Sequence, residues 1–212
     1  MFGYKQSNLD HTLFTKHNNG KVAIFIVYVD DMVLTCDDVE EMKLLEKRLA
    51  AKFEMKDLGQ LKYFLGIEIA RSKQGIFLSQ RKYILDLLAK TGMLACKPID
   101  TPIEMNHFLV VYLDQDETDK NIYQRLVGKL FNLSHTRLDI AYSVSIVSRF
   151  MHSPSEEHMN TIYCILKYLK GSPGKGLLYY KNNKAGIEGY TDSDWAGDKT
   201  TRQSTLGYFT FV

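Results

Sequence analysis

The chain has 212 residues, of which 45% are hydrophobic and 25% charged, which excludes a disordered tail and leaves room for one large or two small domains with a core. Three widely spaced cysteines exclude a simple disulfide framework, and the absence of a signal peptide or an apolar run of roughly 20 residues predicts an intracellular protein without a membrane span. The net charge of +2 divides into −2 over residues 1–120, +5 over 121–181 and −1 over 182–212, so the middle segment is expected to face a polyanion, although a solvated helix face gives the same pattern.

The first predicted elements are two buried strands joined by an acidic turn. Residues 22–29 form an apolar run rich in β-branched and aromatic side chains, and 32–36 resume it after Asp30 and Asp31. An amphipathic helix follows from Asp38 to Phe53. Residues 65–69 and 75–78 then predict a second hairpin. This succession indicates an α+β fold.

A helical pattern begins at Gln80 and ends near Gly92. After a loop, further helices are expected around residues 121–134, 138–151 and 154–170. The last one is predicted to begin with Ser153 as N-cap, Pro154 in the first position and Glu156 completing a capping box. The histidines of this region, His152 and His158, are interpreted as helix-surface residues without a metal.

The C-terminal part of the sequence predicts strands rather than helices. Three short runs have the required composition: residues 177–180, 187–192 and 206–212. Because domains seldom end on an apolar strand, we expect the third strand to be truncated.

The acidic turn is the strongest chemical signal. Two adjacent carboxylates at the tip of an apolar hairpin repel each other. Either exposure to water or a bound divalent cation offsets this repulsion. A solvated turn and a metal site are therefore both open interpretations. Mg²⁺ requires rigidly held hard oxygen ligands, and a tight hairpin supplies that rigidity.

An ordered series of motifs resembles the reverse transcriptase of copia-type LTR retrotransposon polyproteins. The series runs over nearly the whole chain, and the order of the motifs is more specific than any one of them. The motifs are Tyr28-Val29-Asp30-Asp31, Leu58 to Ile69, Ser79-Gln80 with Tyr83, Tyr123 to Leu130, Thr136-Arg137 with Asp139-Ile140, Ser148 to Met151, Tyr168-Leu169-Lys170 and Tyr190 to Gly197.

The resemblance implies the architecture of a right-handed polymerase within the α+β class. Residues 1–79 would be the C-terminal part of the palm, 80–175 a helical thumb or connection, and 176–212 the N-terminal strands of a truncated ribonuclease H-like domain. It also implies a location in a cytoplasmic particle and the nucleus. The expected partners are an RNA or DNA template with its primer and deoxynucleotide triphosphates.

The resemblance also implies roles for particular residues. Asp30 and Asp31 would hold Mg²⁺ (or Mn²⁺) for nucleotidyl transfer, with Tyr28 beside the primer terminus. Gly66 would belong to the primer grip, although it can equally mark a bulge. Asp192, as a catalytic residue, and Asp194 would bind metal at the start of the ribonuclease H domain. The same residues are also consistent with an Asp-rich segment at the end of a strand, without a metal. Phosphate contacts are expected from the basic side chains of the helical region: Arg125, Lys129, Arg149, Lys167 and Lys170.

The sequence also departs from the family pattern. The family's first catalytic aspartate lies upstream of Met1, its ribonuclease H domain continues beyond Val212, and Leu138 stands where the family has proline. We therefore expect the chain alone not to polymerise. The alternatives are a non-catalytic nucleic-acid-binding remnant, a metal-dependent nuclease built on Asp192 and Asp194, and, least favoured, a purely structural interaction protein.

Overall fold

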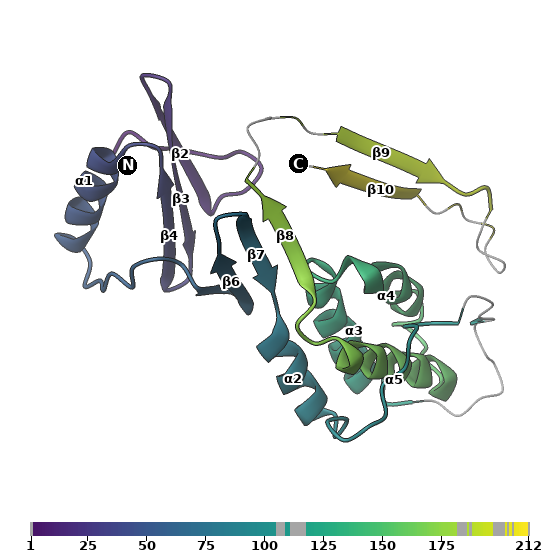
Figure 1. Ribbon diagram of the computed structural model, residues 1–212. Helices are drawn as coiled ribbons and strands as arrows, with labels where there is room; N and C mark the ends of the chain where they lie inside the picture. Colours follow the sequence, from purple (N-terminus) through teal and green to yellow (C-terminus); the bar gives the residue numbers. More distant parts are fainter. Residues whose placement is uncertain are drawn as a thin grey trace. The chain divides into compact units, whose positions relative to one another are not determined.

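The computed structural model describes residues 2–104, 109–110, 118–181, 186, 188–196, 202, 204 and 206–211. The chain divides into two compact units, Met1–Leu61 and Lys62–Val212. Both combine helices with antiparallel strands, which confirms the predicted α+β class (Figure 1).

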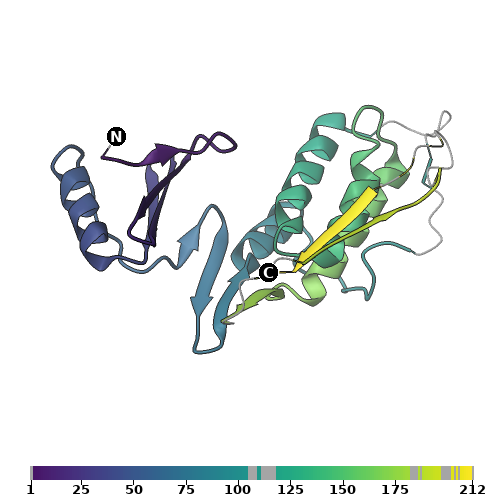
Figure 2. The same ribbon diagram turned by 90° about the horizontal axis from the view of Figure 1, so that it is seen from above.

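The first unit is a four-stranded antiparallel sheet with one helix. The strands are β1 (Lys5–Gln6), β2 (Leu13–Asn18), β3 (Lys21–Tyr28) and β4 (Asp31–Cys36), in the order β1-β2-β3-β4. The helix α1 (Val39–Ala50) lies along the sheet, as Figure 2 shows from above, and buries Leu45 and Leu49 against Ala23 and Tyr4. The predicted β3, β4 and α1 are confirmed, but β1 and β2 were missed because their mixed polar and apolar residues follow no clear alternation.

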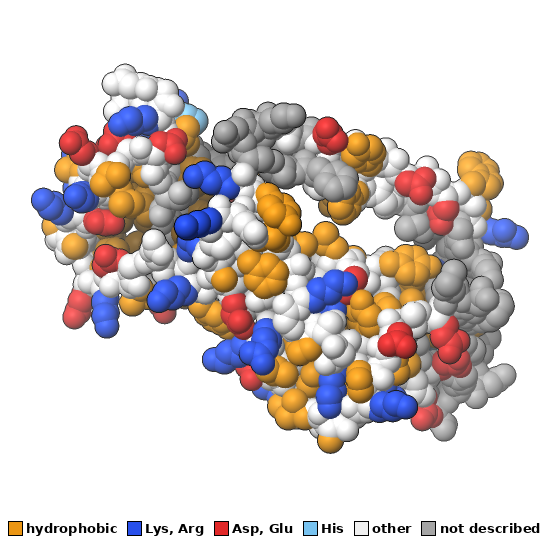
Figure 3. Space-filling view, viewed as in Figure 1, with side chains coloured by type: hydrophobic (Ala, Val, Ile, Leu, Met, Phe, Trp, Pro, Cys, Tyr) orange, Lys and Arg blue, Asp and Glu red, His pale blue; other side chains and the backbone are white. Residues whose placement is uncertain are grey.

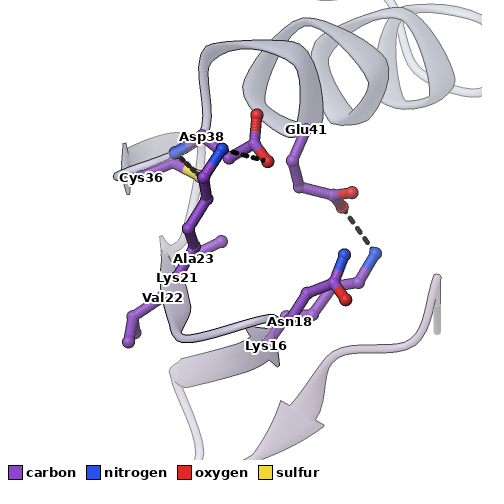
Figure 4. A pocket seen from close by; sticks show the side chains of 8 residues that line it. All are labelled: Lys16, Asn18, Lys21, Val22, Ala23, Cys36, Asp38 and Glu41. Atoms are coloured by element: carbon purple, nitrogen blue, oxygen red, sulfur yellow. Dashed lines mark hydrogen bonds and ion pairs between the residues drawn. The ribbon is translucent and has the colours of Figure 1, made fainter.

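Ion pairs fix α1 to the strands at the end of the β3–β4 hairpin that is remote from the acidic turn. Lys16 Nζ lies 2.7 Å from Glu41 Oε1, and Lys21 Nζ lies 3.0 Å from Asp38 Oδ2 (Figure 4). Asp38 is the N-cap of α1, as predicted, and accepts a hydrogen bond from the Glu40 amide. The cavity between these side chains holds about 10 Å³, so it has room for one water molecule and not for a substrate.

The second unit contains a four-stranded antiparallel sheet in which three neighbouring strands pair with one from far along the sequence. Its strands are β5 (Tyr63–Phe64), β6 (Ile67–Arg71), β7 (Gly75–Ser79) and β8 (Gly176–Tyr180), in the order β5-β6-β7-β8. Strand β8, assigned from the sequence to the ribonuclease H-like segment, pairs with β7 and places Gly176 opposite Ser79. The boundaries at 79/80 and 175/176 stay a prediction.

Helices form the core of the second unit between β7 and β8. They are α2 (Arg81–Lys90), α3 (Lys120–Ser134), the short 3-10 helix η1 (Leu138–Ile140), α4 (Ala141–Ser148) and α5 (Glu156–Gly171). Helix α5 packs against α2, α3 and α4. Several of its apolar side chains are fully buried: Ile162, Ile165, Leu166 and Leu169. The predicted helices are confirmed, except that the one expected at 138–151 begins as η1 and ends at Ser148.

The start of α5 differs from the sequence prediction. Its N-cap is Ser155 rather than Ser153, and His158 rather than Glu156 completes the capping box. The Ser155 amide donates to His158 Nδ1 at 2.9 Å, and His158 Nε2 lies 2.9 Å from the Val110 carbonyl oxygen. The ring also stacks on Phe150 at 3.9 Å.

The interpretation of His158 as a surface residue was therefore wrong. The side chain is fully buried because it replaces the glutamate of an ordinary capping box and fills space beside Phe150. Burial lowers the pKa of His158, and the neutral ring suits a position in which Nδ1 accepts a hydrogen bond. His152 is exposed, as predicted.

The last two strands form a separate hairpin. Strand β9 (Glu188–Ser193) pairs antiparallel with β10 (Leu206–Phe211), so Asp192 lies opposite Gly207. Both strands were predicted, although residues 187 and 212 lie outside the described residues.

Candidate functional site

The acidic turn closes the β3–β4 hairpin with only two residues. Tyr28 pairs with Asp31, so Val29 and Asp30 form the turn itself. The turn is fixed because the two strands on either side of it pair in continuous register from Ala23 with Cys36 up to this point. Asp30 and Asp31 are thus consecutive residues at the tip of the hairpin, Asp30 within the turn and Asp31 at the start of β4, and both are exposed.

Val29 has a backbone conformation that β-branched residues rarely adopt. Its φ is +52° and its side chain is 81% exposed, so no packing of the side chain explains the conformation. A two-residue hairpin turn requires positive φ because only then does its twist match that of the strands, and glycine or asparagine usually provides it. The turn therefore stores backbone strain immediately before the two carboxylates.

Replacing Val29 by glycine is expected to stabilise the first unit by about 1 kcal/mol, because glycine adopts positive φ without the steric penalty. The measurement is the free energy of unfolding of the full chain in urea. The control is Val33→Gly within β4, which should destabilise, because glycine weakens a strand interior. If Val29→Gly instead lowered the free energy of unfolding, the Val29 side chain would stabilise the fold by more than its backbone strain destabilises it.

The oxygens of Asp30 and Asp31 are of the chemical type that a divalent metal site requires. Carboxylates are the hard ligands that Mg²⁺ and Mn²⁺ prefer, so the donor set fits such an ion. Within the described residues, however, no cluster of three or more His, Cys, Asp or Glu side chains surrounds a possible ion. Asp30 and Asp31 thus fit two ligands of a metal site, and the remaining ligands have to come from outside this cluster.

Gly66 lies in a second two-residue turn rather than in a strand. Phe64 pairs with Ile67, and the residues between them, Leu65 and Gly66, have φ of +48° and +86°. Positive φ at both positions defines a type I′ turn, which explains the glycine. A Cβ on Gly66 would meet the Tyr83 ring at 3.6 Å, an ordinary contact, so close approach is not the reason for it.

A buried amide network that the sequence did not reveal joins the start of α2 to the end of α3. Gln80, which is 1% exposed, donates from Nε2 to Asn132 Oδ1 at 2.8 Å and accepts from Thr136 Oγ1 at 2.7 Å. Asn132 and Thr136 lie 52 and 56 residues after Gln80, so no periodic pattern in the sequence indicates that they meet. The family motifs around Gln80 and Thr136 thus have a structural explanation in this chain.

Several of the predicted phosphate-binding residues lie around one groove, the α2–α3 groove. Arg125 and Lys129 of α3 line it together with Lys90 of α2 and Tyr163 of α5, and its volume is about 500 Å³. Lys167 lies one helical turn after Tyr163 and so on the same side of α5. Figure 3 shows Lys and Arg side chains over α2 and α5. Sequence reasoning missed Lys90, whose only signal was its place at the end of the predicted helix.

The other two predicted basic residues lie elsewhere. Lys170 donates from Nζ to the Leu94 carbonyl oxygen and thereby holds the loop after α2. Arg149 follows the last residue of α4 and lies 6.0 Å from the centre of the Phe150 ring. Their proposed phosphate contacts stay predictions.

A buried polar cluster surrounds Arg137, whose side chain is fully buried. Its Nε and Nη2 atoms donate to the two carboxylate oxygens of Asp139 at 3.0 and 2.9 Å, and Nη1 donates to the Ser172 carbonyl oxygen at 2.8 Å. Asp139 also accepts from Tyr168 Oη at 2.7 Å and Lys175 Nζ at 3.0 Å. Although burial acts to raise it, the pKa of Asp139 is lowered by the hydrogen bonds from Arg137, Tyr168 and Lys175. These bonds join the end of α5 to η1, so the cluster is structural.

The two aspartates of the predicted ribonuclease H site are exposed. Asp192 lies in β9, and Asp194 lies one residue beyond the end of that strand. Their role stays a prediction.

Comparison with known proteins finds a family model that matches the first half of the chain and relatives that match nearly all of it. The family model for reverse transcriptase (RNA-dependent DNA polymerase) matches residues 1–105. The chain is 41% identical to the Pol polyprotein of transposon RE1 from Arabidopsis thaliana over 99% of its own length, and 35% identical to that of transposon TNT 1-94 from Nicotiana tabacum over 93%. It spans only 14% and 16% of those polyproteins.

A shorter relative covers a similar segment. An uncharacterised mitochondrial protein of Arabidopsis thaliana is 40% identical over 88% of this chain and 78% of its own length. No solved structure matches the chain. None of the helices in the described parts of the chain is long and apolar enough to cross a membrane.

Proposed function

We propose a role that follows from the family, since this chain belongs to the reverse transcriptases of copia-type retrotransposon Pol polyproteins and is a fragment of their RNA-directed DNA polymerase domain. We propose that its acidic turn contributes to the site that joins deoxynucleotides to the 3′ end of a primer on an RNA or DNA template. The observation that carries this proposal is the position of two consecutive, exposed aspartates at the tip of a two-residue hairpin turn.

Reverse transcriptases use divalent metal ions, and for this chain we propose Mg²⁺ or Mn²⁺ at Asp30 and Asp31. A bound ion would neutralise phosphate charge and lower the pKa of the attacking hydroxyl. Asp30 supplies its carboxylate from within the turn and Asp31 from the first position of β4. Tyr28, which is 47% exposed, offers a ring beside them against which the primer terminus can pack. The hairpin fixes the backbone of both residues, so less backbone entropy is lost when an ion binds.

Metal binding at the turn is tested by adding Mn²⁺ to the isotopically labelled full chain and measuring paramagnetic broadening of amide NMR signals. We expect broadening centred on residues 28–31 that is lost in the Asp30→Asn/Asp31→Asn variant, because the amides remove both negative charges. The matched control is Asp37→Asn at the other end of the same hairpin, where Asp37 accepts a hydrogen bond from the Val22 amide that asparagine can also accept. Equal broadening in the double variant would count against a metal site at the turn.

We further propose that the basic residues of the helical unit contact the template and primer. Arg125 and Lys129 line the α2–α3 groove, Lys167 lies one turn beyond Tyr163 on α5, and Arg149 and Lys170 lie at the ends of α4 and α5. Each phosphate contact releases counterions, so removing one should reduce the slope of log affinity against log salt by about 1. Gly66 would place the Leu65–Gly66 turn against the primer strand.

A non-catalytic nucleic-acid-binding protein is the second candidate. The observation that favours it is the lack of a third carboxylate, histidine or cysteine beside Asp30 and Asp31 within the described residues. Fluorescence anisotropy with a labelled primer–template, compared with primer extension in Mg²⁺, separates the two candidates. We expect salt-sensitive binding without extension by the 212-residue chain alone, and measurable extension would contradict this expectation. Cleavage of an RNA–DNA hybrid would instead support a nuclease at Asp192 and Asp194.

A further inference from the structure

The α2–α3 groove has the geometry of a small-molecule site. Helices α2 and α3 each pack against α5, and Tyr163 of α5 lies between them. The α3 residues that line it, Ile122, Arg125, Leu126 and Lys129, follow one another at helical spacing and so form one face. The volume of about 500 Å³ lies within the roughly 300–1,000 Å³ of typical ligand sites.

The charge of the groove has one sign. Its lining contains three cations, Lys90, Arg125 and Lys129, and no acidic side chain. None of these three forms a hydrogen bond or ion pair with a residue that the structure describes, so their donors are available to a ligand. The hydroxyl of Thr91 is already used, because it donates to the Leu87 carbonyl oxygen at 2.9 Å.

Two carboxylates lie close to the groove along its own helices without lining it. Asp86 precedes Lys90 by one turn of α2, and Asp119 caps α3 and accepts a hydrogen bond from the Ile122 amide at 2.9 Å. Because neither carboxylate lines the groove, the charged side chains of its lining are all positive, which suits an anion with several charges.

We propose that the α2–α3 groove binds a nucleoside triphosphate, as a second nucleotide site separate from the acidic turn. The three cations match the charge of a triphosphate, and the partly exposed ring of Tyr163 offers a surface for the base. A groove of this size holds one nucleotide. Because the side chains supply the positive charge, binding does not require a metal ion.

The test is isothermal titration of dATP into the full 212-residue chain in EDTA. We expect binding that weakens about tenfold in each of Lys90→Gln, Arg125→Gln and Lys129→Gln, since each removes one charge-assisted contact. The matched controls are Lys82→Gln on α2 and Lys120→Gln on α3, exposed lysines outside the lining, which should bind as the unmodified chain does. Binding that is unchanged by all three groove variants, or no binding of dATP, would overturn the proposal.

Further titrations separate the phosphate and base contacts. Deoxyadenosine should not bind, and inorganic triphosphate should bind more weakly than dATP. Tyr163→Leu should weaken dATP but not inorganic triphosphate. An oligonucleotide duplex that binds through Lys90, Arg125 and Lys129 while dATP does not would overturn the choice of ligand. Binding of dATP should persist in Asp30→Asn/Asp31→Asn, so failure at the acidic turn and failure at the groove are distinguishable.

Discussion

Asp139→Asn is expected to lower the free energy of unfolding of the helical unit by about 3 kcal/mol at neutral pH, because it leaves the buried guanidinium of Arg137 without a counter-charge. The side chain of Asp139 is 20% exposed and that of Arg137 0%, so solvent screens this pair only weakly. Urea unfolding followed by circular dichroism measures the loss. The control is Asp86→Asn, an exposed aspartate on α2, for which we expect a change close to zero.

The same variant has a defined pH dependence. Burial acts to raise the pKa of Asp139. The hydrogen bonds from Arg137, Tyr168 and Lys175 have the larger effect and hold this pKa below its ordinary value of 3.8. The unfolded chain therefore binds this proton first, and the stabilisation is complete above about pH 3.8 and is lost as the pH falls through the folded pKa. The difference between the unmodified chain and Asp139→Asn should shrink below pH 4. A difference that grows on acidification would contradict this account.

Gly176→Ala is expected to disrupt the pairing of β8 with β7 and to destabilise the second unit by about 3 kcal/mol. An added Cβ would lie 2.1 Å from the Leu78 carbonyl oxygen and 3.0 Å from its carbon, and backbone atoms cannot move aside as a flexible side chain can. Thermal unfolding of the full chain measures the change.

Gly174→Ala is the control for this substitution. It lies two residues earlier, and its Cβ would meet only the flexible Arg81 side chain at 3.8 Å. We expect its unfolding temperature to stay near that of the unmodified chain. Equal destabilisation by both substitutions would mean that chain flexibility, and not the contact with β7, is what glycine provides here.

The sequence predicted the elements whose apolar residues repeat regularly. Strands β3 and β4 and helices α1, α2, α3 and α5 were recognised because each buries one continuous face. Strands β1 and β5 have only two residues each, too few for a period, and β2 mixes Lys16 and His17 with apolar residues. The start of α5 was misplaced because Ser153 and Ser155 are both good N-caps, and only the burial of His158 distinguishes them.

The candidate site was predicted unevenly for a similar reason. Asp30 and Asp31 are adjacent in the sequence, so their juxtaposition at the turn could be predicted from the hairpin pattern alone. The α2–α3 groove could not be predicted in this way. Lys90 and Arg125 are separated by a long loop, and their proximity depends on how α2 and α3 pack on α5. The network around Gln80 and the cluster around Arg137 likewise depend on contacts between residues far apart in the chain.

The pairing of β7 with β8 has a consequence for the order of folding. Ser79 and Gly176 meet across roughly a hundred residues of intervening chain, and such non-local contacts form late. During synthesis on a ribosome, β7 must wait until α2 to α5 have emerged and its partner has left the exit tunnel. Until then one side of β7 is an open edge with unpaired amides, which is a surface on which nascent chains aggregate. A chaperone that shields this edge would therefore raise the yield of folded protein more than one that acts on the first unit, whose strands pair with near neighbours as they appear.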